Sequence, residues 1–325
     1  MIILTLDIQG LNTHFYTEEG VVKAVDNVDL KIEEGEILGV VGESGCGKST
    51  IALSVMRLIP YPPGKIVSGR ILFEMQDLLE ASDEEIRKIR GKSISMIFQD
   101  PIASLNPLFT IGFQIEEAIR AHLNLKDPEV LDRVVELMGK VGISDAKRRI
   151  ADYPHSFSGG MRQRAMIAMA LSCNPRLLIA DEATTNLDVT IQAQILDLML
   201  NLRKEFGSSI LLITHNMGVV AELADRIAVM YAGWIVELAD AVTIFQSARH
   251  PYTRALLASV PRLDVRQKYI SSIPGDVPNL IEPPPGCRFA PRCSFATARC
   301  KQLRPEMEQI GPEHLVACFE QAKIG

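Results

Sequence analysis

The chain has 325 residues, of which 47% are hydrophobic and 23% charged, and its formal net charge is −6. These values are ordinary for a globular protein of one or two domains. The negative charge argues against a nucleic-acid surface, which would be basic. No apolar run reaches the roughly 18–20 residues that cross a bilayer. Because the N-terminus shows neither a basic region nor a small-residue cleavage site, we expect a protein kept in the cytosol.

Alternating apolar and polar positions over residues 3–8 and 21–38 predict antiparallel strands at the start of the chain. Two aromatic residues, Phe15 and Tyr16, lie between these runs. Either ring could stack on an adenine base. The alternative is an aromatic side chain half-buried in a strand, and the pattern alone does not separate the two.

A glycine-rich loop follows a short apolar run at residues 37–41 and precedes helix-compatible spacing at residues 50–56. Its sequence fits the G-x-x-x-x-G-K-S pattern, in which backbone N–H groups and a helix N-terminus surround phosphate oxygens. In such a loop Lys48 reaches the β- and γ-phosphates and Ser49 ligates Mg²⁺. We therefore predict a nucleotide phosphate site made of Gly42, Glu43, Ser44, Gly45, Cys46, Gly47, Lys48, Ser49 and Thr50.

The rest of the chain to about residue 245 alternates apolar strands with helices, which predicts a parallel sheet covered on both faces. A helical insert over 111–150 ends before Pro154. Helices are also expected from Ser158 to about Cys173 and over 189–206. Three apolar runs end in polar side chains, where the carboxyl edge of such a sheet binds ligands: residues 93–99, 177–182 and 209–215.

These strand ends supply catalytic side chains. Asp181 is placed to ligate the Mg²⁺ held by Ser49, with Gln99 as a further ligand. Glu182 can accept a proton from the attacking water or orient it. Gln99 and His215 could both reach the γ-phosphate. A single polar residue at a strand end is usually only a polar cap, but the group together predicts hydrolysis of a nucleotide.

A second helix start also carries phosphate-binding features. Ser158, Gly159 and Gly160 open a helix whose N-terminus suits an anion. The glycine loop already serves the phosphates of its own chain. The second helix start is therefore explained if it contacts a nucleotide bound by another subunit.

Together these motifs resemble the ATP-binding subunits of ABC transporters over about residues 1–245. The matching segments are residues 42–50 (Walker A), Gln99 (Q-loop), 158–164 (signature), 181–182 (Walker B), 186–188 (D-loop) and His215 (H-loop). Phe157 replaces the usual leucine before the signature, and Ala183 replaces a frequent proline. Neither change removes a catalytic group.

The resemblance implies an α/β P-loop ABC ATPase with a mixed sheet core, an antiparallel β subdomain and a helical subdomain at about 100–172. It implies ATP and Mg²⁺ as cofactors and two domains that sandwich two ATP molecules. Hydrolysis would open that dimer. The residues expected to contact nucleotide or partner across the interface are Ser158, Gly159, Gly160, Gln163 and Asp188.

A narrower resemblance points to the dipeptide and oligopeptide importers. It rests on residues 99–107, 250–257 and 283–318. It implies two membrane permeases, a second ATPase (a different protein favoured over a second copy) and an external solute-binding protein, with this chain peripheral at the cytoplasmic face. Residues 100–155 would face the permease, unless the insert only packs. Nickel importers share much of the pattern, so nickel or another small solute is the alternative.

The C-terminal extension, residues 246–325, contains four cysteines in the spacing C-x5-C-x6-C-x17-C: Cys287, Cys293, Cys300 and Cys318. In a reducing cytosol such a group favours metal over disulfides. Zinc sites usually contain one tight cysteine pair, which this small, irregular segment lacks. The wide spacing favours a [4Fe–4S] cluster, and so does the resemblance to iron–sulfur-bearing importer ATPases. Zinc and free or disulfide-linked cysteines remain alternatives.

Two other functions are less compatible with the sequence. A non-transport ABC ATPase of DNA repair would carry long coiled coils between the ATP motifs, and one acting in translation would usually contain two cassettes. Only about 110 residues separate the motifs here, and one cassette is present. A P-loop enzyme that phosphorylates a small molecule would leave residues 158–164 without a role. We therefore predict that the chain is the ATPase subunit of a transporter.

Overall fold

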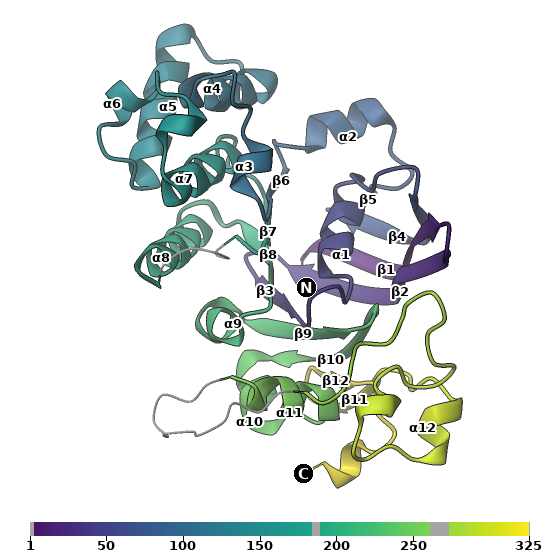
Figure 1. Cartoon of the computed structure of the whole chain (residues 1–325). Helices are drawn as coiled ribbons and strands as arrows, with labels where there is room; N and C mark the ends of the chain where they lie inside the picture. Colours follow the sequence, from purple (N-terminus) through teal and green to yellow (C-terminus); the bar gives the residue numbers. More distant parts are fainter. Residues whose placement is uncertain (1–2, 184–188, 261–272, 325) are drawn as a thin grey trace. The chain divides into compact units, whose positions relative to one another are not determined.

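A computed structural model of the chain describes residues 3–183, 189–260 and 273–324. The chain folds into two compact units, whose elements are labelled in Figure 1. The helical unit comprises Met1–Thr5, Glu33–Glu36 and Glu80–Leu212. The phosphate-loop unit comprises Leu6–Ile32, Ile37–Leu79 and Ile213–Gly325. Among the described residues, no helix combines the length and apolarity needed to cross a membrane.

The helical unit contains a parallel strand pair and several helices, which are labelled in Figure 1. Its strands are β6 (Ile94–Ile97), β7 (Leu177–Asp181) and most of β8 (Ser209–Thr214), adjacent in the order β8-β7-β6. Its helices are α2 (Asp83–Ile89), α3 (Pro101–Ser104), α4 (Ile111–His122), α5 (Asp127–Lys140), α6 (Ala146–Arg149), η1 (Pro154–Ser156), α7 (Gly159–Ala170) and α8 (Val189–Phe206).

Local sequence explains where these helices begin. Ser82 caps α2 in a reciprocal capping box with Glu85. Thr110 caps α4 by accepting a hydrogen bond from Phe113 N. The predicted helical insert over 111–150 is confirmed as α4, α5 and α6. Its core is formed by fully buried aliphatic side chains at helical spacing: Ile115, Ile119, Val130, Val134 and Met138.

The phosphate-loop unit contains two sheets. Its elements are β1 (Leu4–Thr17), β2 (Gly20–Glu33), β3 (Ile37–Val41), α1 (Lys48–Val55), β4 (Gly64–Phe73), β5 (Gln76–Asp77), α9 (Met217–Leu223), β9 (Arg226–Tyr231), β10 (Trp234–Asp240), α10 (Ala241–Ser247), α11 (Pro251–Ala258), η2 (Ala290–Arg292), α12 (Ala298–Gln302), β11 (Glu308–Gly311), β12 (His314–Val316) and η3 (Gln321–Lys323).

One sheet has the order β2-β1-β4-β5, with β1 and β4 antiparallel, as the alternating pattern predicted. In the other, β3 runs parallel to β9, while β10 is antiparallel to both β9 and β12. The sheet is therefore mixed, as the resemblance implied. Every residue of β3 is buried, which agrees with an apolar run covered on both faces.

Two details differ from the sequence expectations. Strand β1 continues to Thr17, past the predicted end at residue 8, because pairing with β4 extends to Phe15. The C-terminal segment was expected to be irregular, yet β12 adds to the edge of β10, and β11 pairs with β12. Backbone pairing across the sheet, which local propensity does not encode, gives this segment its order.

Candidate nucleotide-binding site

The glycine loop lies between β3 and α1, as its flanking sequences predicted. Gly47 caps α1 with φ of 110°, a conformation that favours glycine. A Cβ on Gly47 would lie 2.1 Å from the Ala24 carbonyl oxygen, and one on Gly42 would lie 2.1 Å from that of Met230. The loop therefore depends on glycine both for its backbone conformation and for close approach to neighbouring strands.

Lys48 is the cation of this loop. Its side chain is buried, and its ammonium donates to the backbone carbonyls of Gly42 at 2.8 Å and Glu43 at 3.0 Å. The first turn of α1 contains no acidic residue, so no carboxylate of that turn competes with a bound anion for the N–H groups at the helix start. The loop thus presents a lysine and a helix N-terminus, the combination that binds phosphate.

Cys46 lies inside the same loop and is fully buried. Burial raises the pKa of its thiol above the ordinary value, although nearby Lys48 opposes the shift. The thiol is therefore neutral at physiological pH and acts as a small packed side chain.

The two candidate aromatic residues differ in exposure. Tyr16 is 49% exposed near the end of β1. Phe15 is half-buried and pairs with Gly64 of β4, where a Cβ would lie 2.8 Å from the Phe15 ring. Tyr16 is therefore the ring more open to a base, and Phe15 packs within the sheet.

The predicted catalytic carboxylates lie in the helical unit. Asp181 is buried at the end of β7. Glu182 follows with φ of 48°, a left-handed conformation that is uncommon for a residue with a side chain and recurs at functional sites. Gln99 is exposed, and its amide donates to the Glu182 carboxylate at 2.8 Å. The structure thus brings Gln99 and Glu182 together, as the strand-end pattern predicted.

His215 follows β8 in the phosphate-loop unit and is exposed. The next residue, Asn216, caps α9. The histidine is therefore held between the end of a buried strand and a capped helix, which restricts its backbone while its ring stays accessible.

The second predicted phosphate-binding helix start is α7. Ser158 caps it, accepting a hydrogen bond from Met161 N at 3.4 Å. Ser158 and Gly159 are exposed, and no described atom lies within 4 Å of a Cβ placed on Gly159. Gln163 is in a different environment: it is buried, and its amide donates to the Ala183 carbonyl at 2.6 Å. The remaining interface candidate, Asp188, lies outside the described residues.

The four cysteines of the extension line one cavity, together with apolar side chains such as Phe289 and Phe295. None forms a disulfide. Burial, reinforced by neighbouring cysteines, raises the pKa of Cys287 to about 11 and of Cys318 to about 12. No group of three or more His, Cys, Asp or Glu side chains in the described part of the chain is arranged to hold a metal ion.

Sequence reasoning missed three residues that contact the glycine loop or support its contacts. Glu43 N donates to the Tyr252 hydroxyl at 2.9 Å, and Arg292 forms an ion pair with the Glu43 carboxylate. The Arg292 guanidinium also donates to the Tyr231 hydroxyl at 3.2 Å. The segment containing Tyr252 was noted only for its family resemblance, and nothing in the local sequence around Arg292 marks it.

Two family models match the chain. The model described as ABC transporter covers residues 25–185, and the model of the C-terminal region of oligopeptide/dipeptide transporters covers residues 236–300. The first range contains the glycine loop, the α7 start and both carboxylates. The second contains three of the four cysteines.

Curated relatives are similar over nearly their whole length. A probable peptide ABC transporter ATP-binding protein of Sinorhizobium fredii is 51% identical over 99% of this chain and 96% of its own. The oligopeptide transport ATP-binding protein AppD of Bacillus subtilis is 49% identical, covering 97% and 96%. The dipeptide transport ATP-binding protein DppD of Escherichia coli is 45% identical, covering 96% and 95%.

Solved structures of ATP-binding cassettes have the same fold. A dimeric, post-hydrolysis cassette bound to ADP and phosphate matches with a TM-score of 0.66 and 27% identity, over 73% of this chain and 98% of its own. The protein cbiO1 of Clostridium perfringens, part of the ABC transporter complex cbiONQ, matches with a TM-score of 0.63 and 26% identity, over 75% of this chain and 91% of its own.

Proposed function

Because the chain belongs to the ATP-binding proteins of peptide-importing ABC transporters, ATPases that power import, we propose that it binds ATP between two such domains. The start of α7 carries this proposal. Ser158 and Gly159 are exposed at a helix N-terminus, and the space beside Gly159 is open among the described residues. The test is whether ATP joins two chains into one particle when hydrolysis is blocked, measured by gel filtration.

Charge supports a shared nucleotide. ATP carries several negative charges, and each helix N-terminus contributes about half a positive charge. Lys48 and α1 from one domain, with α7 from the other, would share those charges around one triphosphate. Neither α1 nor α7 has an acidic residue in its first turn. When the γ-phosphate leaves, the contact with α7 is lost, so hydrolysis releases the domains.

Within each site we assign the chemistry to residues that the sequence predicted. Mg²⁺ would be held by Ser49 and Asp181, with Gln99 as a further ligand. It would neutralise charge on the β- and γ-phosphates. Glu182 takes the proton of the attacking water or orients it, and the hydrogen bond from Gln99 fixes its carboxylate. His215 contacts the γ-phosphate, Tyr16 (or Phe15) stacks on adenine, and Asp188 lies at the interface.

The transporter also requires permeases, and we propose that residues 100–155 bind them. This segment exposes apolar side chains that a monomer would ordinarily cover: Ile102, Leu108, Phe109, Phe113 and Tyr153. Two of these rings, Phe109 and Phe113, stack at 4.9 Å. The occupant would be a short cytoplasmic helix of each permease, which places this chain peripherally at the cytoplasmic face of the membrane.

Replacing Leu108 with aspartate is expected to reduce binding to permease-containing membranes at least tenfold. Leu108 is 79% exposed, and the introduced carboxylate would be buried in the proposed apolar contact with the permease. Co-sedimentation with membranes that contain the permeases measures the change. The matched control is Met75→Asp, which alters an equally exposed side chain (81%) in the β4–β5 turn. Equal loss in both variants would contradict the assignment of this surface.

We favour peptides as the solute and a different second ATPase as the partner, with an external binding protein delivering the solute. The named relatives are peptide, oligopeptide and dipeptide transport proteins, and the C-terminal family model is that of peptide transporters. Nickel or another small solute is the alternative. Uptake of a labelled dipeptide, competed by unlabelled peptide or by Ni²⁺, separates them.

We also propose that the four-cysteine cavity holds a [4Fe–4S] cluster. Four thiolates around a single zinc ion would stand about 3.8 Å apart, and no such group occurs among the described residues. Yet all four cysteines line one cavity, and a cluster with one iron per cysteine accommodates wider separation. Because burial raises the pKa of the Cys287 and Cys318 thiols, bound iron cations would be needed to stabilise their thiolate forms. Such a cluster would supply structural cross-links and, if accessible, one-electron chemistry.

Anaerobically purified protein is expected to contain about four irons per chain and to absorb broadly near about 400 nm. Cys300→Ser should lose most of the iron, because Cys300 is buried in the cavity. Cys173→Ser is the control, since Cys173 lies in the other unit and does not line the cavity. Colourless protein with one zinc per chain would refute the cluster.

A further inference from the structure

Arg292, in the cysteine-bearing extension, is held in one position by a complete set of hydrogen bonds. Its guanidinium donates to both Glu43 carboxylate oxygens at 2.8 and 3.1 Å and to the Tyr231 hydroxyl at 3.2 Å. It also donates to the carbonyls of Ile273 at 3.1 Å and Pro274 at 2.8 Å. These five bonds match the five N–H donors of an arginine. The Arg292 side chain is 4% exposed and that of Glu43 is 27% exposed, so the guanidinium is the buried member of the pair.

Glu43 belongs to the glycine loop, and each of its polar groups has a partner. The carboxylate accepts from Arg292, and the backbone N–H donates to the Tyr252 hydroxyl at 2.9 Å. The backbone carbonyl accepts from the Lys48 ammonium at 3.0 Å. A shift of Glu43 would therefore move the group that positions the phosphate-binding lysine.

Aromatic packing makes the Arg292 contact rigid. Phe289, just before η2, packs on Tyr231 and Tyr252 with ring centroids 5.2 and 5.4 Å apart. Tyr231 and Tyr252 pack on each other at 4.5 Å. These are the same two tyrosines whose hydroxyls contact Arg292 and Glu43. The extension thus approaches the loop as a packed surface, and not through a single mobile side chain.

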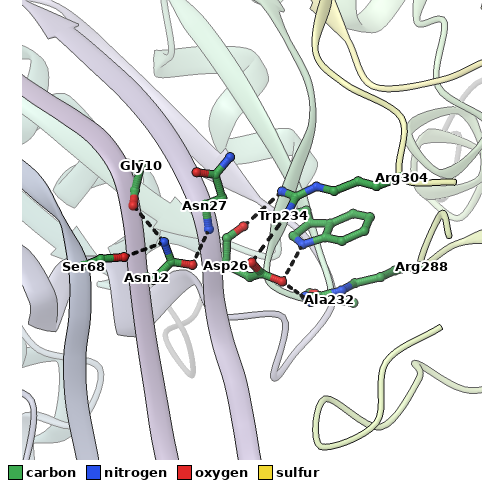
Figure 2. A network of polar contacts seen from close by, with 9 residues as sticks. All are labelled: Gly10, Asn12, Asp26, Asn27, Ser68, Ala232, Trp234, Arg288 and Arg304. Carbon is green, nitrogen blue, oxygen red and sulfur yellow. Dashed lines mark hydrogen bonds and ion pairs between the residues drawn. The ribbon is translucent and has the colours of Figure 1, made fainter. Parts of the chain in front are cut away.

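A second contact holds the extension independently of the loop. In Figure 2, Arg288 and Arg304 lie beside Trp234 and both reach Asp26 of β2. Their guanidinium carbons lie 4.3 and 4.1 Å from the indole centroid. Because this attachment does not involve Glu43, the extension can stay in place when the Arg292 contact is removed. The two contacts can therefore be tested separately.

We propose that Arg292 is a positioning residue for ATP: through Glu43 it fixes the glycine loop, so that the C-terminal extension sets the affinity for nucleotide. The inference rests on the proposed ATP site at Lys48. The loop loses less conformational entropy when it binds nucleotide if it is already held in one conformation. Without Arg292, Glu43 loses its buried partner, and the Lys48 ammonium loses a fixed acceptor.

The test is the dissociation constant of a fluorescent ATP analogue with Mg²⁺, measured on the full chain. Arg292→Gln and Glu43→Gln are each expected to weaken binding about tenfold. The double variant should lose no more than either single change, because both remove the same interaction. Exchange of the two charges, Glu43→Arg with Arg292→Glu, should restore part of the affinity. Iron content and the unfolding midpoint are measured alongside.

Arg304→Gln is the control, because it removes an extension arginine that has no contact with the loop in the described structure. It should change the dissociation constant less than twofold. Unchanged affinity in Arg292→Gln, or equal loss in Arg304→Gln, would overturn the proposal. If Arg292→Gln does not fold, the dissociation constant of Glu43→Gln alone tests the proposal, and an unchanged value would overturn it. Lys48→Ala separates the proposed ATP site from the proposed role of Arg292. If Lys48→Ala binds the ATP analogue as well as the parent protein does, the ATP site is wrong, and the role of Arg292 is refuted as well.

Discussion

Replacing Glu182 with glutamine is expected to lower ATP turnover about 10²–10⁴-fold, the range lost when a general base is removed. ATP should still bind, because the substitution leaves the glycine loop and its lysine unchanged. With hydrolysis blocked, the γ-phosphate persists and should hold two domains together. Gel filtration with ATP and Mg²⁺ should then show a dimer, either of this chain alone or with a co-expressed second ATPase.

The matched control is Glu117→Gln, which removes a carboxylate from an exposed position on α4. Its turnover and oligomeric state should equal those of the parent protein. If the Glu182→Gln variant remains monomeric with ATP, both alone and with the second ATPase, the shared nucleotide site would be refuted. Retained turnover would instead refute only the role of Glu182.

The second large effect concerns stability. Asp26→Asn should lower the free energy of unfolding by about 3–5 kcal/mol, because it removes the carboxylate from a buried guanidinium. The Arg288 side chain is 2% exposed and pairs with Asp26. Arg304 forms an ion pair with the same carboxylate at 3.5 Å, and Trp234 donates to it at 3.1 Å. The urea midpoint of the phosphate-loop unit measures the loss.

The companion variant is Asp26→Asn with Arg288→Met, which removes the stranded charge and should recover much of the stability. Acid provides a second readout. Burial opposes ionisation of Asp26, but Trp234 and the two arginines outweigh it and lower the pKa of the carboxyl below its ordinary 3.8. This contribution is therefore complete above about pH 3.8 and is lost as the pH falls below it. An unchanged midpoint in Asp26→Asn would contradict the energetic role of the pair.

Local chemistry explains why much of the fold could be predicted. The strand–loop–helix around Lys48 and the capped start of α7 depend on neighbouring residues, so glycine spacing and a capping serine were sufficient. The hydrogen bond between Gln99 and Glu182 agrees with the expectation that polar residues at the ends of parallel strands gather at one edge of the sheet, although the bond itself was not predicted. By contrast, the length of β1 and the pairing of β12 with β10 depend on partner strands far away in the sequence.

The sequence by itself determined the family and the glycine loop between a strand and a helix, and it predicted the catalytic side chains, because each of these motifs is encoded in residues that are close along the chain. Only the tertiary structure decided what surrounds that loop. Arg292 and Glu43 are 249 residues apart, and Arg288 and Asp26 are 262 apart. Ion pairs across such separations depend on how strands and the C-terminal segment pack, and no local pattern of residues specifies that.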